Sequence, residues 1–533
     1  MFTIAIISFL FFAYKRSLLS LQFLQQEGYE NKSFLKFIFH KLQLIDKNLT
    51  VVVFLYSVLS VGYKNYLIDI SVLSIIFLIF AFLQYNPLSG KAKKQLILTH
   101  RATRILWVSM GINLFVSSII FYELSILTNY CLCLELGYLL LLIQAIPFIL
   151  IISNIILKPF EVFVRYKYVN EAKQILDDVN PVVIGITGSF GKTSTKNILY
   201  HIVSSLAPTL TTARSINTLM GICQVIRSDL KKNHKYFIVE VGTSAIGKIK
   251  KICNLIKPKF GILTAIGFAH FANFKTQENL ANEKLDLIKA VEKNNGISVI
   301  NSLQVDKKFI PNKNNIFILD DKITDEKHYK LSNIKQDLSG ISFTLSYSKN
   351  DYFITAPIYG LHQANNISLA FIMALKLGIP AETIIATLKT LKQVEHRLEV
   401  KKQSNGITII DDGFNSNVDG FISALDTLKT LSQKGRAILI TPGMVDLGKK
   451  HKEQHIEVAK HALKTCDIVV AVVPDRIKDF VETFEKSMNK NQQIILVDSF
   501  KEALIWTSEN TKSGDVILYE NDLPDVFETK IKI

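Results

Sequence analysis

The apolar and polar positions of this chain divide it into a first third of long apolar stretches and a remainder of short apolar runs. The long stretches cover residues 2–14, 49–63, 67–86, 104–122 and 137–157. Several of them approach the roughly 20 residues that a helix needs to cross a bilayer. We therefore predict an α-helical membrane region over residues 1–160, with about five spans.

Basic residues predict how these spans are oriented. They gather in the links that follow the first, third and fifth stretches, and the other two links carry only Lys64. Because Lys and Arg are enriched on the cytoplasmic side, this pattern predicts an N-terminus outside and a C-terminus in the cytoplasm. Residues 2–14 are not followed by a small-residue cleavage site, so we interpret them as an anchor rather than a removed signal peptide.

From residue 181 onward, short apolar strands alternate with helical patterns. The first round of predicted strands is 181–187, 235–242, 260–266 and 297–301; the second is 406–411, 436–441, 467–473, 493–498 and 515–519. Such alternation predicts parallel sheets with helices on both faces. We expect two α/β domains, at 175–393 and 394–533, the second being Rossmann-like and doubly wound. The polar stretches 303–335 and 345–352 are interpreted as loops or hairpins of the first.

The composition excludes fewer classes of function than the pattern of apolar and polar positions does. The 533 residues carry a net charge of +16, which suits anionic substrates, anionic lipid or nucleic acid, or simply reflects a codon bias toward Lys. No Arg-rich stripe with interleaved aromatic residues is present, so we expect no nucleic-acid partner. The five Cys are scattered without metal-ligand spacing, which fits a reducing compartment for the soluble part.

The run from Val182 to Thr193 carries the strongest chemical signal. It is a β-branched strand, then a Gly-rich loop from Gly188 to Gly191, then Lys192-Thr193 at the start of a helix. Glycines let backbone N–H groups close around phosphate oxygens, a Lys reaches the β- and γ-phosphates, and a Thr hydroxyl can hold Mg²⁺. We therefore predict a P-loop ATPase domain, although such loops also occur in kinases, GTPases and transporters.

The spelling Thr187-Gly188-Ser189-Phe190-Gly191-Lys192-Thr193-Ser194 resembles the central-domain signature of the Mur ligase superfamily. Further segments on the expected strands resemble the same superfamily, and together they cover roughly residues 181–520. They are Asn217-Thr218-Leu219-Met220-Gly221, the strand ending in Glu240, Ala269-His270-Phe271, Gly360-Leu361-His362-Gln363-Ala364-Asn365-Asn366, Arg397, and Asp411-Asp412-Gly413-Phe414-Asn415-Ser416-Asn417. The nearest type is MurF, which adds D-alanyl-D-alanine to a muramoyl tripeptide.

The resemblance implies a set of site residues. Expected ATP-binding residues are Gly188, Ser189, Phe190, Gly191, Lys192, Thr193, Ser194, Asn366, Arg397 and Asp412. Expected Mg²⁺ ligands are Thr193, Glu240, His270 and Lys284, the last through a carbamate, and Lys192, His270 and Lys284 are the expected catalytic residues. Taken alone, a Glu at a strand end is more often a solvated group, a single His more often structural, and a Lys such as Lys284 a surface charge.

The resemblance also implies a reaction. ATP with Mg²⁺ would activate a substrate carboxylate as an acyl phosphate, which an amine then attacks. The expected partners are a muramoyl-peptide precursor, D-alanyl-D-alanine or another amine, the lipid bilayer and other cell-wall synthesis proteins. The expected location is the bacterial cytoplasmic membrane. Two alternatives stay open: a Mur-like ligase that modifies a polyprenyl-linked precursor, and a non-catalytic membrane scaffold that keeps the ligase fold.

Two departures from the superfamily pattern concern substrate recognition. Only about 25 residues separate the last apolar stretch from the loop, too few for the UDP-binding domain of soluble members. The Lys-Gly-Ser-Arg stretch near the end of those members is replaced by Glu520-Asn521-Asp522-Leu523. Both departures leave the expected ATP chemistry untouched.

Overall fold

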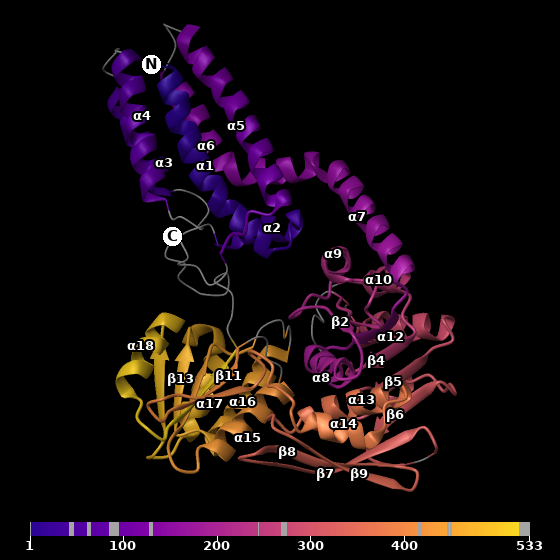
Figure 1. Ribbon diagram of the computed structural model, residues 1–533. Coiled ribbons are helices and arrows are strands. Elements are labelled where there is room, and N and C mark those ends of the chain that lie inside the picture. Colours follow the sequence, from indigo (N-terminus) through magenta and orange to yellow (C-terminus); the bar gives the residue numbers. More distant parts are fainter. Residues whose placement is uncertain are drawn as a thin grey trace. The chain divides into compact units, whose positions relative to one another are not determined.

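The computed structural model describes residues 2–41, 47–60, 66–84, 95–126, 132–243, 245–267, 274, 276–323, 325–413, 418–444, 447 and 450–521. Contacts divide them into two compact units, a helical unit up to Arg165 and an α/β unit from Tyr166 (Figure 1). Each unit has its own hydrophobic core.

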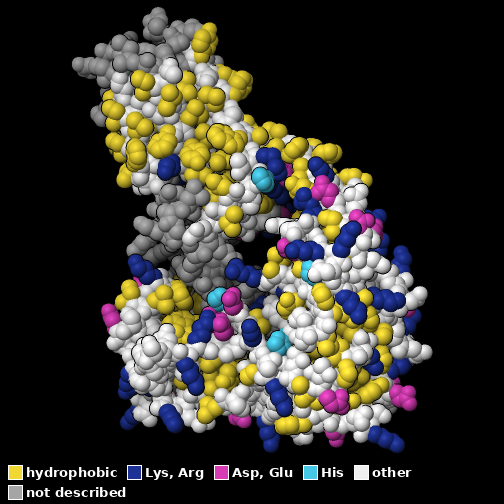
Figure 2. All heavy atoms as spheres, viewed as in Figure 1, with side chains coloured by type: hydrophobic (Ala, Val, Ile, Leu, Met, Phe, Trp, Pro, Cys, Tyr) yellow, Lys and Arg dark blue, Asp and Glu magenta, His cyan; other side chains and the backbone are white. Residues whose placement is uncertain are grey.

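The helical unit is built from long apolar helices. Their bounds are α1 (Phe2–Gln26), α2 (Asn31–Lys41), α3 (Lys47–Ser60), α4 (Tyr66–Leu83), α5 (His100–Ile126), α6 (Leu132–Ile156) and the start of α7 (Lys158–Val179). Helix α1 packs along α4 and α5, and its Phe9 meets Phe77 of α4 edge to face at 5.4 Å between ring centroids. Many hydrophobic side chains of this unit point outward, as on the face seen in Figure 2, a pattern expected of helices that face lipid rather than water.

Among the described residues, two helical segments are long and apolar enough to cross a membrane, Thr3–Gln26 and His100–Ile120. A third joins them if α6 and α7, which meet at a 49° bend, are counted as one span. This is fewer than the five predicted spans, although helices occupy all five apolar stretches. Helix α3 has only 14 residues, and Ser71–Leu83 of α4 falls below the length of a crossing.

The α/β unit opens with a nine-stranded sheet in the order β2-β3-β1-β4-β5-β6-β7-β8-β9. Its strands are β1 (Val182–Thr187), β2 (Thr209–Thr211), β3 (Tyr236–Glu240), β4 (Phe260–Leu263), β5 (Ile297–Asn301), β6 (Ile316–Asp320), β7 (His328–Asp337), β8 (Gly340–Tyr347) and β9 (Asn350–Ala356). In this order, all neighbouring strands from β2 through β1 to β7 are parallel, and β7, β8 and β9 form antiparallel hairpins. The stretches 303–335 and 345–352, predicted as loops or hairpins, do contain hairpin parts: most of β7 lies in the first and the β8–β9 turn lies in the second. The first also holds the parallel strand β6, which was not predicted.

Helices cover both faces of this sheet. On one face lie α8 (Lys192–Ser204), α13 (Gln363–Lys376) and α14 (Ala381–Leu388). On the other lie α9 (Leu219–Asp229), α10 (Lys248–Ile256), α12 (Gln277–Lys293) and the end of α7. A short 3₁₀ helix, η1 (Lys307–Phe309), follows β5.

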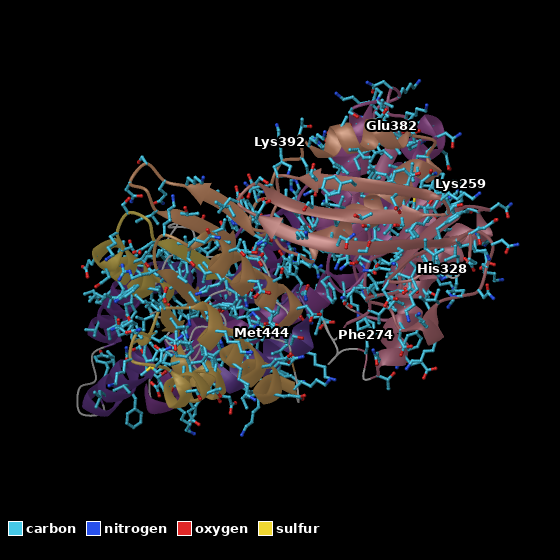
Figure 3. The ribbon with its side chains drawn as sticks, turned by 90° about the horizontal axis from the view of Figure 1, so that it is seen from below. Lys259, Phe274, His328, Glu382, Lys392 and Met444 are labelled. Atoms are coloured by element: carbon cyan, nitrogen blue, oxygen red, sulfur yellow. The ribbon has the colours of Figure 1, made fainter. Side chains whose placement is uncertain are left out.

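A six-stranded sheet follows, in the order β10-β11-β15-β12-β13-β14. Its strands are β10 (Glu399–Lys402), β11 (Thr408–Asp412), β12 (Ala437–Thr441), β13 (Ile468–Val472), β14 (Gln493–Val497) and β15 (Val516–Glu520), all parallel except β10. Helices α15 (Val418–Leu431), α16 (His451–Thr465) and α17 (Lys478–Ser487), the last preceded by η3 (Pro474–Ile477), lie on one face, and α18 (Phe500–Asn510) lies on the other. Figure 3 shows the two sheets from below, with His328 on the first and Met444 beside the second. The predicted doubly wound arrangement is confirmed.

Candidate active site

The Gly-rich loop lies between β1 and α8, at the carboxyl edge of the first sheet. Gly191 has φ 78°, and a Cβ there would come within 2.5 Å of Asn366 Oδ1. A Cβ on Gly188 would come within 2.0 Å of Thr264 Oγ1. Gly191 is also the N-cap of α8 and provides no side-chain cap. The first-turn N–H groups of α8 are therefore suited to receive an anion, as helix N-termini commonly do.

Lys192 folds back onto its own loop. Its Nζ donates to the carbonyl oxygens of Gly188 at 2.8 Å and Ser189 at 3.3 Å. Burial lowers the pKa of Lys192, while the nearby Glu240 carboxylate raises it. The ammonium thus lies at the mouth of the loop, where the phosphates of a nucleotide would take over from the two carbonyls.

Glu240 lies at the end of β3 and is the centre of a polar network. It is 1% exposed. Its Oε2 accepts from the Thr193 hydroxyl at 2.8 Å, and its Oε1 accepts from Asn217 Nδ2 at 2.9 Å. The two strands β1 and β3 are neighbours, with Ile186 opposite Glu240, so the fold brings this carboxylate beside the start of α8.

The Thr193 and Glu240 oxygens suit a magnesium ion. Magnesium prefers hard oxygen ligands and keeps several waters or phosphate oxygens in its shell. Among the described residues, no group of three or more His, Cys, Asp or Glu side chains gathers as a metal site. A magnesium ion here would therefore be held by Glu240 and Thr193 together with phosphate oxygens, which is the usual arrangement for a nucleotide-bound metal.

Lys196 also belongs to this network, although we did not predict it from the sequence. It lies one turn after Lys192 and its side chain is fully buried. Its Nζ donates to the carbonyl oxygen of Thr212 at 2.5 Å and to that of Arg214, and lies 3.8 Å from Glu240 Oε2. Arg214 has the left-handed φ of 46°. The buried ammonium thus joins the carboxylate to the strained 212–214 segment.

Lys284 is buried within α12, with only 4% exposure. Burial and the nearby charge of Lys192 lower its pKa well below the usual lysine range. Its neighbour Glu283 accepts from the backbone N–H groups of Gly247 and Ile249, at 2.5 and 2.8 Å, and so caps α10. A lowered pKa favours the neutral amine, which is the form that reacts with carbon dioxide. The predicted His270 lies outside the described residues.

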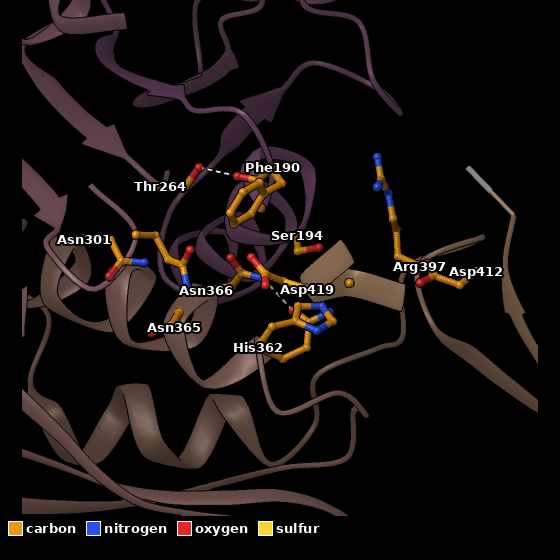
Figure 4. A pocket seen from close by; sticks show the side chains of 14 residues that line it. Phe190, Ser194, Thr264, Asn301, His362, Asn365, Asn366, Arg397, Asp412 and Asp419 are labelled. Atoms are coloured by element: carbon orange, nitrogen blue, oxygen red, sulfur yellow. Dashed lines mark hydrogen bonds between the residues drawn. The ribbon is translucent and has the colours of Figure 1, made fainter. Parts of the chain in front are cut away.

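A pocket between the two sheets collects the remaining predicted residues. It is lined by Phe190, Gly191, Ser194, Thr264, Asn301, Gln304, His362, Gln363, Asn365, Asn366, Arg397, Asp412, Asp419 and Gly420 (Figure 4). Thr264 holds the loop at its rim by donating to Phe190 O at 2.5 Å. The pocket thus adjoins the Gly-rich loop, where the base of a loop-bound nucleotide would lie.

The side chains of Asn366 and Asn365 differ in the hydrogen bonds that they already make. The Asn366 Oδ1 lies 3.2 Å from Thr195 Oγ1, and its Nδ2 donates to Gln363 Oε1 at 2.9 Å. The Asn365 Oδ1 is buried and has no hydrogen-bond partner among the residues that the structure describes. Since a buried polar atom without a partner is costly, Asn365 is the better placed of the two to accept from a ligand.

Arg397 and Asp412 come from the part of the chain that forms the second sheet, and lie side by side in Figure 4. Asp412 Oδ1 accepts from the Leu398 N–H at 3.1 Å. Burial raises the pKa of Asp412 to about 7, and Arg397 opposes this rise. Burial lowers the pKa of Arg397, which the charges of Asp412 and Glu240 oppose. Arg397 therefore lies within electrostatic reach of residues on both sheets.

Family models match the chain in two places. The Mur ligase middle domain matches residues 186–374, and the glutamate ligase domain of Mur ligases matches residues 396–519. The chain belongs to the Mur ligase family. The two matches contain every predicted site residue, including His270 and Lys284.

Two relatives of this Mur ligase family member carry the same enzyme name. It is 26% identical over 359 residues to the UDP-N-acetylmuramoyl-tripeptide–D-alanyl-D-alanine ligase of Bacillus subtilis (strain 168), covering 66% of this chain and 75% of that protein. It is 29% identical over 288 residues to the ligase of the same name from Buchnera aphidicola (subsp. Baizongia pistaciae, strain Bp). That match covers 53% of this chain and 61% of the Buchnera protein.

Solved structures share the fold. MurF from Thermotoga maritima in complex with ADP superposes with a TM-score of 0.58 and 24% identity, over 67% of this chain and 80% of that chain. MurF from Acinetobacter baumannii gives a TM-score of 0.57 and 22% identity, over 67% of this chain and 77% of that chain. The α/β unit is therefore a Mur ligase fold.

Proposed function

We propose that this protein is an ATP-dependent ligase that joins a muramoyl tripeptide to D-alanyl-D-alanine in peptidoglycan precursor synthesis. The observation that carries the proposal is the contact of Thr193 with Glu240, 2.8 Å apart, beside the Gly-rich loop and within electrostatic reach of Arg397. The family membership and the relatives' names support the same activity.

The chain's own groups have separate roles in the proposed reaction. The α8 N-terminus and Lys192 bind the phosphates of ATP, the pocket with Asn365 and Asn366 receives the base, and Asp412 and Arg397 hold the ribose and phosphates from the other side. Bound magnesium, held by Thr193 and Glu240, would neutralise charge on the β- and γ-phosphates. Lys284, as a carbamate, and His270 complete the proposed set.

Two bond changes follow from this arrangement. A carboxylate oxygen of the tripeptide attacks the γ-phosphorus, the bond to the β-phosphate bridging oxygen breaks, and ADP leaves behind an acyl phosphate. The neutral amine of D-alanyl-D-alanine then attacks the acyl carbon, loses a proton, and inorganic phosphate departs. The buried setting of Glu240 and Lys284, 1% and 4% exposed, would keep water from hydrolysing the acyl phosphate.

Lys192→Ala tests the proposal in the purified full chain. With UDP-linked muramoyl tripeptide, D-alanyl-D-alanine and ATP, wild type should form the pentapeptide and release ADP, and Lys192→Ala should lose at least about 100-fold in rate, as expected when a charge-stabilising group is removed. Lys173→Ala, an exposed lysine of α7, is the matched control. Wild type that binds ATP but never ligates would instead support a non-catalytic scaffold.

A lipid-linked acceptor is the second candidate, favoured by the apolar helices of the first unit. The same assay with the polyprenyl-linked muramoyl tripeptide separates the two, because only the preferred acceptor should give a high kcat/KM. We further propose that the protein resides in the bacterial cytoplasmic membrane as a multi-pass protein, N-terminus outside, with the ligase part in the cytoplasm.

A further inference from the structure

Short helical segments with exposed basic and aromatic side chains gather at one end of the helical unit. One is α2, with Lys32, Leu35, Lys36 and Phe39 exposed. The other is the first two turns of α7, with Lys158, Phe160, Phe163 and Arg165 exposed. We call these eight residues the collar. The two segments are more than 110 residues apart in the sequence, so only the tertiary structure brings them to the same end.

Polar contacts hold the two segments at this end. Asn154, near the end of α6, donates through Nδ2 to Asn31 Oδ1 at 2.7 Å and to Tyr29 O at 3.1 Å. Its Oδ1 accepts from Arg101 at the start of α5, at 3.1 Å. The start of α2, the start of α5 and the end of α6 therefore lie at one level of the helix bundle.

The start of α7 is fixed at the same level. Arg104 of α5 donates to Glu161 Oε1 at 2.7 Å, and its guanidinium carbon lies 5.3 Å from the centroid of the Phe160 ring. Because Arg104 neutralises Glu161, Lys158 and Arg165 dominate the charge of this segment. The chain bends by 49° between α6 and α7, so α7 departs from the direction of the preceding apolar helix.

The apolar side chains of the two collar segments are only partly buried against the rest of the helical unit. Phe34 and Ile38 turn inward and are buried in the core of the unit. Phe39, Phe160 and Phe163 turn outward, with exposures of 61%, 49% and 64%. In α6 the exposed side chains Ile155 and Ile156 come directly before the bend. Along the chain, the exposed apolar side chains thus change from aliphatic at 155–156 to aromatic at Phe160 and Phe163, next to the basic Lys158 and Arg165.

This order of exposed side chains, first aliphatic and then aromatic and basic, matches the hydrocarbon core of a bilayer and its anionic headgroups. Aromatic rings favour the headgroup level, and exposed Lys and Arg bind lipid phosphates there. We propose that the collar lies in the plane of the membrane surface and binds anionic phospholipid headgroups. This inference rests on the proposed membrane location and not on the ligase activity, and its tests need neither nucleotide nor acceptor.

Trp107 offers a built-in probe. It lies one turn after Arg104 on α5 and is 66% exposed, and the other tryptophan, Trp506, lies in the α/β unit. The full chain with Trp506→Phe is reconstituted in phosphatidylcholine vesicles that hold traces of dansyl-labelled phosphatidylglycerol or dansyl-labelled phosphatidylcholine. Energy transfer from Trp107 should be at least twofold greater to the anionic lipid. Equal transfer to both lipids would overturn the proposal.

Charge variants locate the binding. Replacing Lys32, Lys36, Lys158 and Arg165 together by Gln should bring transfer to the two lipids to the same level. The matched control replaces four exposed lysines of the α/β unit, Lys231, Lys232, Lys248 and Lys250, by Gln. It should keep the anionic preference, and an equal loss in both variants would contradict a localised collar.

A depth measurement keeps every charge in place. Phe163→Trp in a Trp107→Phe, Trp506→Phe background should be quenched strongly by lipids brominated near the headgroup and weakly by lipids brominated near the chain end. Tyr200→Trp, 37% exposed on α8, is the control and should not be quenched. A tryptophan at 163 that no brominated lipid quenches would place this segment in water and refute the proposal.

Discussion

In the proposed function, single residues would decide how the pocket beside the Gly-rich loop recognises the base of ATP. The family pattern pointed to Asn366 as the residue that contacts the base, yet Asn366 is already engaged by Thr195 and Gln363. Asn365, which we did not predict, carries a buried oxygen that has no partner in the described part of the chain. Asn366 therefore shapes the pocket, and Asn365 is free to accept from a base amine.

Asn365→Ala should raise the KM for ATP about fivefold, because one hydrogen bond of about 1 kcal/mol is lost. It should change the KM for inosine triphosphate little, because that base has no exocyclic amine to donate. Steady-state ADP release with both nucleotides checks this. A similar loss for both nucleotides would show that the Asn365 side chain does not read the amine.

Lys196→Met should weaken binding of magnesium–nucleotide and lower kcat by about 10- to 100-fold, as is typical when a group that orients a metal ligand is removed. Met keeps the buried volume but cannot hold Glu240 or the 212–214 carbonyls. Calorimetry with ADP at several magnesium concentrations measures the effect directly. Wild-type affinity in Lys196→Met would show that Glu240 is oriented without it.

At the level of elements, His455 of α16 joins this helix to the segment that follows β12, and its hydrogen-bond partners set its protonation state. His455 is fully buried. Its Nε2 accepts from the Met444 N–H at 3.1 Å, and its Nδ1 lies 2.8 Å from the carbonyl oxygen of His451. Only the neutral ring with a proton on Nδ1 satisfies both partners, and burial lowers the pKa of His455 to about 4.

Stability should therefore fall as the pH falls from about 6.5 to about 4, because the unfolded chain takes up a proton that the folded chain refuses. The full effect of His455 is about 3 kcal/mol, since one pKa unit corresponds to about 1.4 kcal/mol. Thermal melts of wild type and His455→Gln across this range check it. The variant should be less stable near pH 7 and lose less on acidification; parallel curves would contradict the assignment.

At the scale of the whole molecule, the helical unit should hold the ligase part at a membrane. Helices such as His100–Ile120 satisfy their backbone hydrogen bonds internally and expose apolar side chains, which only a bilayer accommodates in quantity. The expected result is that full-length protein stays with membranes after washes with high salt and alkaline carbonate and is released by detergent. Release by salt alone would show peripheral attachment and refute multi-pass insertion.

Local features could be predicted from the amino-acid sequence alone: the strand, loop and helix around Lys192, the apolar helices, and the strand ending in Glu240. These follow from periodicity and from glycines that local geometry requires. The sequence did not predict β6 as a strand, and it gave most of β7 only as part of a stretch of loops or hairpins, because few positions of β7 are buried. The proposed division at 160, 175–393 and 394–533 stays a prediction. Packing sets which side chains meet, as Lys196 does with Glu240. It also leaves Asn365 Oδ1 without a partner among the described residues, and brings α2 and the start of α7 to one end of the helical unit. Such contacts join residues distant along the chain, and burial and partner geometry, which set their chemistry, exist only after packing.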